Sequence, residues 1–143
     1  MKKLPLLLAL LLSGGWAMAQ SNCATPVLKA YEGNQQVNVA GSAMPASIKL
    51  VLAKASGCPS DVSYQLTGAE VTLVRGRRPI LPARRYDNAE LDLSEFRNAY
   101  QPGDRLFVSV PAAGVTMTSA AGKQEKYPAT EEEAFQLNWV LSK

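Results

Sequence analysis

The fold is decided by the stretch from Val62 to Val110, which reads VSYQLTGAEVTLVRGRRPILPARRYDNAELDLSEFRNAYQPGDRLFVSV. Apolar and polar residues alternate over Val62–Val74 and again over Arg105–Val110, the period of half-buried strands. Between these runs, the spacing of apolar residues predicts a short helix over Leu93–Tyr100. Pro102-Gly103-Asp104 supplies a turn before the second strand. The stretch therefore predicts two strands that bracket a helix, and it contains no pattern typical of a catalytic centre.

Two local signals refine this prediction. Gly68 interrupts the first run, which predicts either one bent strand or two short ones. Asp92 and Glu95 have the spacing of a capping box, which places Asp92 at the N-cap of the helix. The apolar face of that helix is then formed by Leu93, Phe96 and Tyr100.

Strand patterns continue on both sides of this stretch. Upstream, extended runs are predicted over Val27–Tyr31, Gln36–Val39 and Ile48–Ala53, and downstream a hairpin begins at Val115 and a terminal strand covers Phe135–Ser142. About seven to nine strands and one short helix predict an all-β, Ig-like antiparallel β-sandwich. The predicted core consists of Ile48, Leu50, Leu66, Val71, Leu73, Phe96, Leu106, Val108, Leu137 and Trp139.

The N-terminus has the three parts of a secretory signal peptide. Lys2 and Lys3 precede an apolar run over Leu4–Leu12, and Ala17-Met18-Ala19 forms a cleavage site. We therefore expect residues 1–19 to be removed and residues 20–143 to form a single exported domain, in the periplasm or at the cell surface, with no further membrane insertion. Removing 19 of the 143 residues leaves 124, and losing both lysines lowers the formal net charge from +3 to +1.

The two cysteines and the absence of histidine restrict the chemistry of the chain. In an exported protein, Cys23 and Cys58 most simply form one disulfide, which would close a loop of about 36 residues. Two free thiols or a bond to a partner are the alternatives. A lipid on Cys23 is disfavoured because the preceding residues, Gln20-Ser21-Asn22, are polar. The spacing of Cys23 and Cys58 is far from CxxC, and no histidine could complete a tetrahedral site, so we expect neither a metal site nor a cofactor.

Five arginines follow the first strand in a segment that contains Gly76, Pro79 and Pro82. The prolines rule out a helix, so a loop is predicted. One interpretation is a solvated loop whose arginines pair with Glu90, Asp92 or Glu131–Glu133. The other is a partner-binding surface, because guanidinium groups recognise carboxylates and phosphates. The candidate binding residues are Arg75, Arg77, Arg78, Arg84 and Arg85.

The order of these segments carries a family resemblance. The strand and basic segment VSYQLTGAEVTLVRGRRP, then YQPGDRLFVSV, then the terminal AFQLNWVL resemble the C-terminal periplasmic domain of GldM, the shaft protein of the gliding-motility and type IX secretion motor. The resemblance covers roughly residues 58–142. It implies a β-sandwich that docks to other envelope proteins. GldM is anchored by a transmembrane helix and contains several such domains, whereas we expect a cleavable signal peptide and a single domain here. The resemblance therefore does not imply that this protein transmits torque.

The first functional hypothesis is therefore a non-enzymatic protein-binding or assembly module of the cell envelope. Without histidine, the Ser-His and Cys-His mechanisms are excluded. A hydrolase with paired carboxylates is the enzymatic alternative, but the acids lie at turns, a helix cap and a polar linker. Its candidate residues are Glu70, Asp87, Glu90 and Asp104. A nearly neutral mature chain without aromatics among the arginines is not expected to bind nucleic acid. An anionic envelope polymer or a lipid head group is the alternative ligand.

Overall fold

The computed structural model describes residues 25–55 and 61–143. The described part of the chain is mostly strand, with one short α-helix and one 3-10 turn. The all-β class predicted from the sequence is therefore confirmed. The elements are β1 (Val27–Glu32), β2 (Gln35–Gln36), β3 (Ser47–Ala53), β4 (Ser63–Leu66), β5 (Ala69–Arg75), β6 (Arg78–Pro79), β7 (Arg84–Tyr86), β8 (Glu90–Asp92), α1 (Ser94–Ala99), β9 (Arg105–Pro111), η1 (Ala112–Gly114), β10 (Val115–Thr118), β11 (Gln124–Lys126) and β12 (Ala134–Val140).

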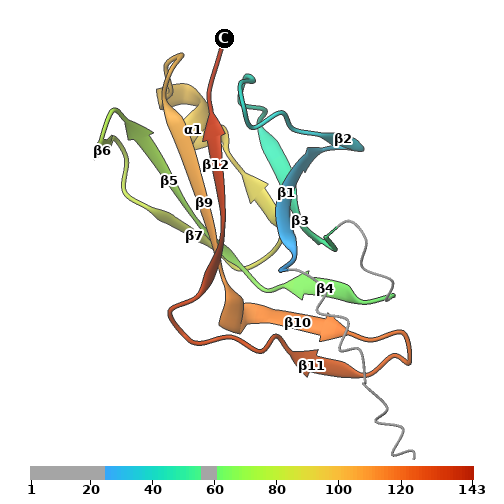
Figure 1. The fold of residues 1–143 in the computed structure, drawn as a ribbon. Coiled ribbons are helices and arrows are strands. Elements are labelled where there is room, and N and C mark those ends of the chain that lie inside the picture. The colour runs from blue at the N-terminus through green and yellow to red at the C-terminus, as the bar shows by residue number, and fades with distance from the viewer. Residues whose placement is uncertain (1–24, 56–60) are drawn as a thin grey trace, which may run out of the picture.

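The strands form three sheets, and all pairings between named strands are antiparallel. One sheet has the order β2-β1-β3-β8, and the second has the order β12-β9-β5-β6, with β7 also paired to β5. These two sheets form the layers of the sandwich, and the small sheet β11-β10-β4 lies at their lower end (Figure 1). Helix α1 lies at the opposite end of the second sheet.

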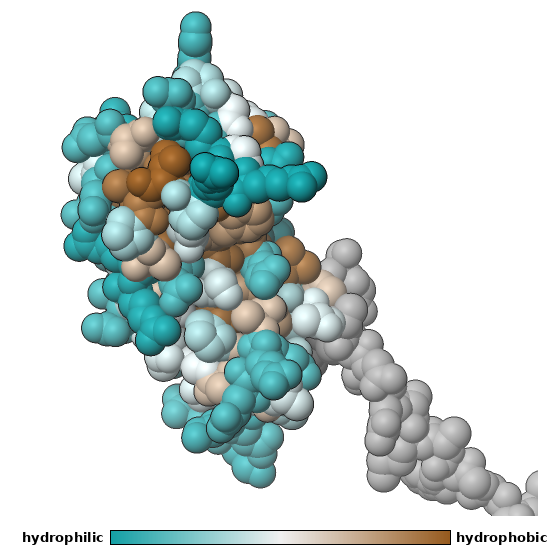
Figure 2. All heavy atoms as spheres, turned by 90° about the vertical axis from the view of Figure 1, so that its left-hand side faces the viewer, coloured by the Kyte–Doolittle hydropathy of each residue, from teal (hydrophilic) through white to brown (hydrophobic). Residues whose placement is uncertain are grey.

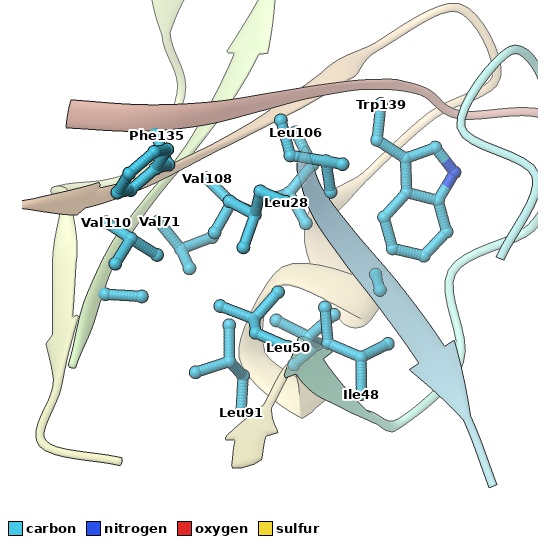
Figure 3. Packing of buried hydrophobic residues seen from close by; sticks show 14 of the residues in the cluster. Leu28, Ile48, Leu50, Val71, Leu91, Leu106, Val108, Val110, Phe135 and Trp139 are labelled. Atoms are coloured by element: carbon cyan, nitrogen blue, oxygen red, sulfur yellow. The ribbon is translucent and has the colours of Figure 1, made fainter. Parts of the chain in front are cut away.

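The hydrophobic core lies between the two layers. Alternate residues of β5, β9 and β12 point inward, among them Val71, Leu106 and Trp139, and they face Ile48 and Leu50 of β3 (Figure 3). Nine of the ten predicted core residues are buried. Leu66 is the exception, because β4 pairs with β10 in the small sheet and its side chains are only partly covered.

Gly68 separates two strands that belong to different sheets. β4 before it pairs with β10, whereas β5 after it pairs with β9 and β7. A Cβ atom on Gly68 would lie 2.4 Å from the backbone oxygen of Tyr86, so any side chain would collide with β7. Glycine therefore allows β7 to cross closely at this break.

The predicted strand over Gln36–Val39 is wrong beyond its first residue. β2 ends at Gln36, and the chain then leaves the first sheet to reach the second one. The Val140 N–H donates to the Val39 carbonyl over 2.8 Å, and Ser42 forms a parallel bridge with Leu141. The alternation of polar and apolar residues here reflects a connection that lies half-buried across the edge of β12.

The predicted capping box is also wrong. Asp92 is the last residue of β8, and its carboxylate accepts hydrogen bonds from the N–H and hydroxyl of Ser94, the first residue of α1. Glu95 does not reach back to the N-cap but contacts Arg84. The helix itself is confirmed, with Phe96 and the preceding Leu93 buried.

The signal peptide, Cys23 and Cys58 lie outside the described residues, so export and the disulfide stay predictions. Within the described ranges, neither helix has the length and apolar character needed to cross a bilayer. The terminal strand has the predicted orientation, since Phe135, Leu137 and Trp139 are buried and the residues between them are exposed.

Candidate functional site: a basic hairpin at the sheet edge

The five candidate arginines lie along one edge of the second sheet. We call residues 75–85 the basic hairpin. The sequence predicted a loop here, but the segment contains β6 and the start of β7, which both pair with β5. Arg75 and Arg78 are register partners across the turn, where Gly76 has a φ of 62°. The Ile80 N–H donates to the Leu73 carbonyl over 3.0 Å, so the hairpin is fixed to the sheet by its backbone.

Arg75 is held by a buried carboxylate. Its Nε donates to Oδ1 of Asp104 and its Nη2 donates to Oδ2, each over 2.9 Å, which makes a bidentate pair. Nη2 also donates to the Ala99 carbonyl at the end of α1. Asp104 is 2% exposed, and its carboxylate accepts a further hydrogen bond of 2.7 Å from the Gln101 N–H. The hydrogen bonds from Arg75 lower the pKa of Asp104 below its ordinary value, although burial opposes this. Arg75 thus joins β5, α1 and the turn before β9.

Arg84 and Arg85 also have partners within the protein. Arg84 forms an ion pair with Glu95 of α1, and its guanidinium lies 5.6 Å from the centre of the Tyr86 ring. Arg85 Nε lies 3.1 Å from a carboxylate oxygen of Glu70 on the neighbouring strand β5. These exposed pairs fix the position of both side chains but contribute only about 0–1 kcal/mol each to stability.

Arg77 and Arg78 differ from the other three. Both are exposed at the turn between β5 and β6. Within residues 25–55 and 61–143, neither side chain makes a hydrogen bond or an ion pair. The basic hairpin therefore presents two guanidinium groups whose charge is not neutralised by a carboxylate of the described chain.

The partners of the arginines are not those considered from the sequence. Glu90, Asp92 and Glu131–Glu133 form no ion pair with the five arginines. The three arginines that are paired, Arg75, Arg84 and Arg85, contact Asp104, Glu95 and Glu70. The separation of these residues along the sequence does not predict the pairs, because they depend on which strands lie side by side. Asp104, in the turn before β9, reaches Arg75 only because β9 pairs with β5.

The four carboxylates of the hydrolase hypothesis are dispersed. Glu70 and Asp87 line one hollow of 340 Å³ together with Arg85 and Tyr86, where Glu70 is already bonded to Arg85. Glu90 lies on β8 in the other layer, and Asp104 is held by Arg75. The structure therefore brings two of the four residues together. In the described residues, no group of acidic side chains is arranged to hold a metal ion.

Comparison with known proteins yields no match to a family model, to a curated protein or to a solved structure.

Proposed function

We propose that this protein is a non-enzymatic, exported module of the cell envelope that docks to an acidic segment of another envelope protein through the basic hairpin. The observation that supports this most is the contrast within the hairpin. Arg75, Arg84 and Arg85 are used internally, whereas Arg77 and Arg78 project from a backbone-fixed turn without a carboxylate partner in the described chain. The resemblance to the GldM periplasmic domain favours the same class of function.

The rigidity of the hairpin is part of the argument. Arg77 and Arg78 lie between β5 and β6, whose pairing fixes the backbone on both sides of the turn. Ordering two side chains on a fixed turn costs less conformational entropy than ordering a mobile loop. Guanidinium groups also form bidentate hydrogen bonds with carboxylates, which gives an acidic partner both attraction and orientation.

The test compares two double variants that remove the same charge. R77S/R78S alters the basic hairpin, and K123S/K126S alters the distant hairpin between β10 and β11. Each tagged protein is isolated from its native envelope at several salt concentrations, and co-purifying proteins are quantified by mass spectrometry. We expect the R77S/R78S variant to lose its partner while melting within a few degrees of the wild type, because the substituted side chains are exposed. The K123S/K126S variant should retain it.

Salt distinguishes the proposed contact from an apolar one. Recovery with the wild type should fall as ionic strength rises, because the Debye length shortens to about 10 Å at 0.1 M salt. Full recovery with R77S/R78S would overturn the proposal. Equal losses with the two variants would also overturn it, since binding would then follow net charge and not the hairpin. Recovery of an envelope polymer or lipid instead of a protein would favour the alternative ligand class.

A further inference from the structure

The outer face of the second sheet, beside the basic hairpin, has an exposed aromatic residue. Residues of β5, β9 and β12 alternate between the core and this face, and Phe107 lies at an outward position of the central strand β9. Its exposed fraction is 38%, and it is one of two large hydrophobic residues exposed in the described chain. Its register partners on both sides are the polar residues Thr72 and Asn138.

An apolar hollow lies one strand away from Phe107, at its register partner Thr72. The connection between β6 and β7 lies next to β5 and, with Thr72, borders a shallow, open hollow of about 600 Å³. Its walls are the register neighbour of Phe107 and a run of apolar residues, namely Thr72, Pro79, Ile80, Leu81, Pro82 and Ala83. Figure 2 looks onto this edge of the molecule and shows hydrophobic residues gathered within a border of hydrophilic ones. A single exposed Phe needs no explanation, but an aromatic residue near an apolar hollow resembles a binding surface.

The charges on this surface that lack a partner among the described residues are positive. Arg105 lies on the same face as Phe107, two residues earlier on β9, and Pro79, Val74 and Arg105 form one row across the sheet. Arg77 and Arg78 lie at the neighbouring turn. On the outward positions of β5, β9 and β12, the one carboxylate is Glu70, which is bonded to Arg85. Arg105 forms no ion pair with another described residue.

We propose that this outer face binds an acidic protein segment that carries one large apolar side chain. The apolar side chain would occupy the hollow at Thr72, the register neighbour of Phe107, and the flanking carboxylates would contact Arg105 on the same face and Arg77 at the neighbouring turn. This inference rests on the proposed function and adds the chemical nature of the partner to it. Charge complementarity selects the acidic segment and rejects basic ones, while the hollow selects a segment with an apolar residue over a purely acidic one.

The experiment titrates the isotopically labelled exported protein with three short peptides, acetylated and amidated, with the sequences EELEE, EESEE and SSLSS. Backbone amide signals of Thr72, Leu81 and Phe107 report binding in NMR spectra. We expect EELEE to shift these signals saturably and to bind at least about fivefold more tightly than EESEE, because only EELEE offers the apolar anchor. SSLSS should bind most weakly, since it lacks carboxylates.

Two matched variants test the anchor. F107S removes the aromatic residue of the surface, and V27S removes the other exposed large hydrophobic residue, on β1 in the opposite layer. We expect F107S to weaken EELEE binding to the level of EESEE and V27S to leave it unchanged. Both substitutions are at exposed positions, and unchanged spectra elsewhere would show that the fold is intact.

Each failure has its own meaning. If EELEE and EESEE bind equally and both depend on Arg77 and Arg78, the apolar half of the proposal is wrong while the docking function stands. If neither acidic peptide shifts the signals, the proposed acidic segment is wrong. Binding to phosphatidylglycerol vesicles without binding to EELEE would replace the protein segment by a lipid surface and overturn the inference.

Discussion

At the scale of single residues, Asp104 links the candidate site to the fold. It is the one charged residue that is buried in the described ranges, and three hydrogen bonds from Arg75 and the Gln101 N–H satisfy its oxygens. Removal of the carboxylate would cost Arg75 two of its three hydrogen bonds and leave the Gln101 N–H without its acceptor. Asp104 therefore has a structural role, in keeping with its position in a turn, which counted against the hydrolase hypothesis in the sequence.

We predict that D104N lowers the free energy of unfolding by about 2–3 kcal/mol at pH 7, because charge-assisted hydrogen bonds are lost in the interior. The pKa of Asp104 is lowered in the native state by its hydrogen bonds with Arg75, so its contribution is fully present above the unfolded pKa of about 3.9. The contribution is lost as the pH falls through the lower native pKa. The gap between wild type and D104N, measured by urea unfolding, should therefore narrow below pH 4.

The exposed Asp61 supplies a control, since D61N should change the free energy of unfolding by less than about 0.5 kcal/mol both at pH 7 and at pH 2. A gap between wild type and D104N that stays constant from pH 7 to pH 2 would show that the charge of Asp104 does not contribute.

At the scale of elements, β5 organises both the core and the candidate site. Its inward residues Val71 and Leu73 are fully buried, while its edge pairs with β6 and β7 and so fixes the basic hairpin. The start of β5 depends on Gly68, where the backbone of β7 approaches too closely for a side chain. The hairpin is therefore positioned by contacts at both ends of the same strand.

We predict that G68A destabilises the protein by about 1–3 kcal/mol, because the new methyl group would meet the Tyr86 carbonyl oxygen and force β7 away from β5. Thermal or urea unfolding measures the loss. G41A is the matched control, since no atom lies within 4 Å of a Cβ at that position, and its stability should change by less than about 1 kcal/mol. If G68A is as stable as G41A, the close approach does not constrain the strand break.

At the scale of the whole molecule, segments distant in sequence close the sandwich. The connection through Val39 and Ser42 comes from the first layer and bonds the end of β12 in the second. The indole N–H of Trp139 donates to the Ser42 hydroxyl over 2.9 Å, which adds a side-chain contact at the same place. The final strand is thereby held on one side by β9 and near its end by this connection.

The predicted disulfide would add a second long-range constraint. We predict that the intact mass of the exported protein equals that of a chain that begins at Gln20 and has lost the two thiol hydrogens to a disulfide. Reduction should lower stability by up to about 4 kcal/mol, the loop-closure value for about 36 residues. Mass spectrometry with and without reductant, combined with alkylation, measures both features. A lipid on Cys23, or two thiols that react without reductant, would contradict this prediction.

The all-β class, the helix near Phe96, and the faces of β5, β9 and β12 could be predicted from the sequence, because alternation of apolar and polar residues records which side of a strand is buried. The sequence also located the arginines. The internal pairing of Arg75, Arg84 and Arg85 follows from how the strands are arranged in space. So do the separation of two sheets at Gly68 and the place of the Arg77 turn beside the face that carries Arg105 and Phe107. A period-2 pattern defines the two faces of a strand but neither its neighbours nor its register, and ion pairs across a sheet depend on both.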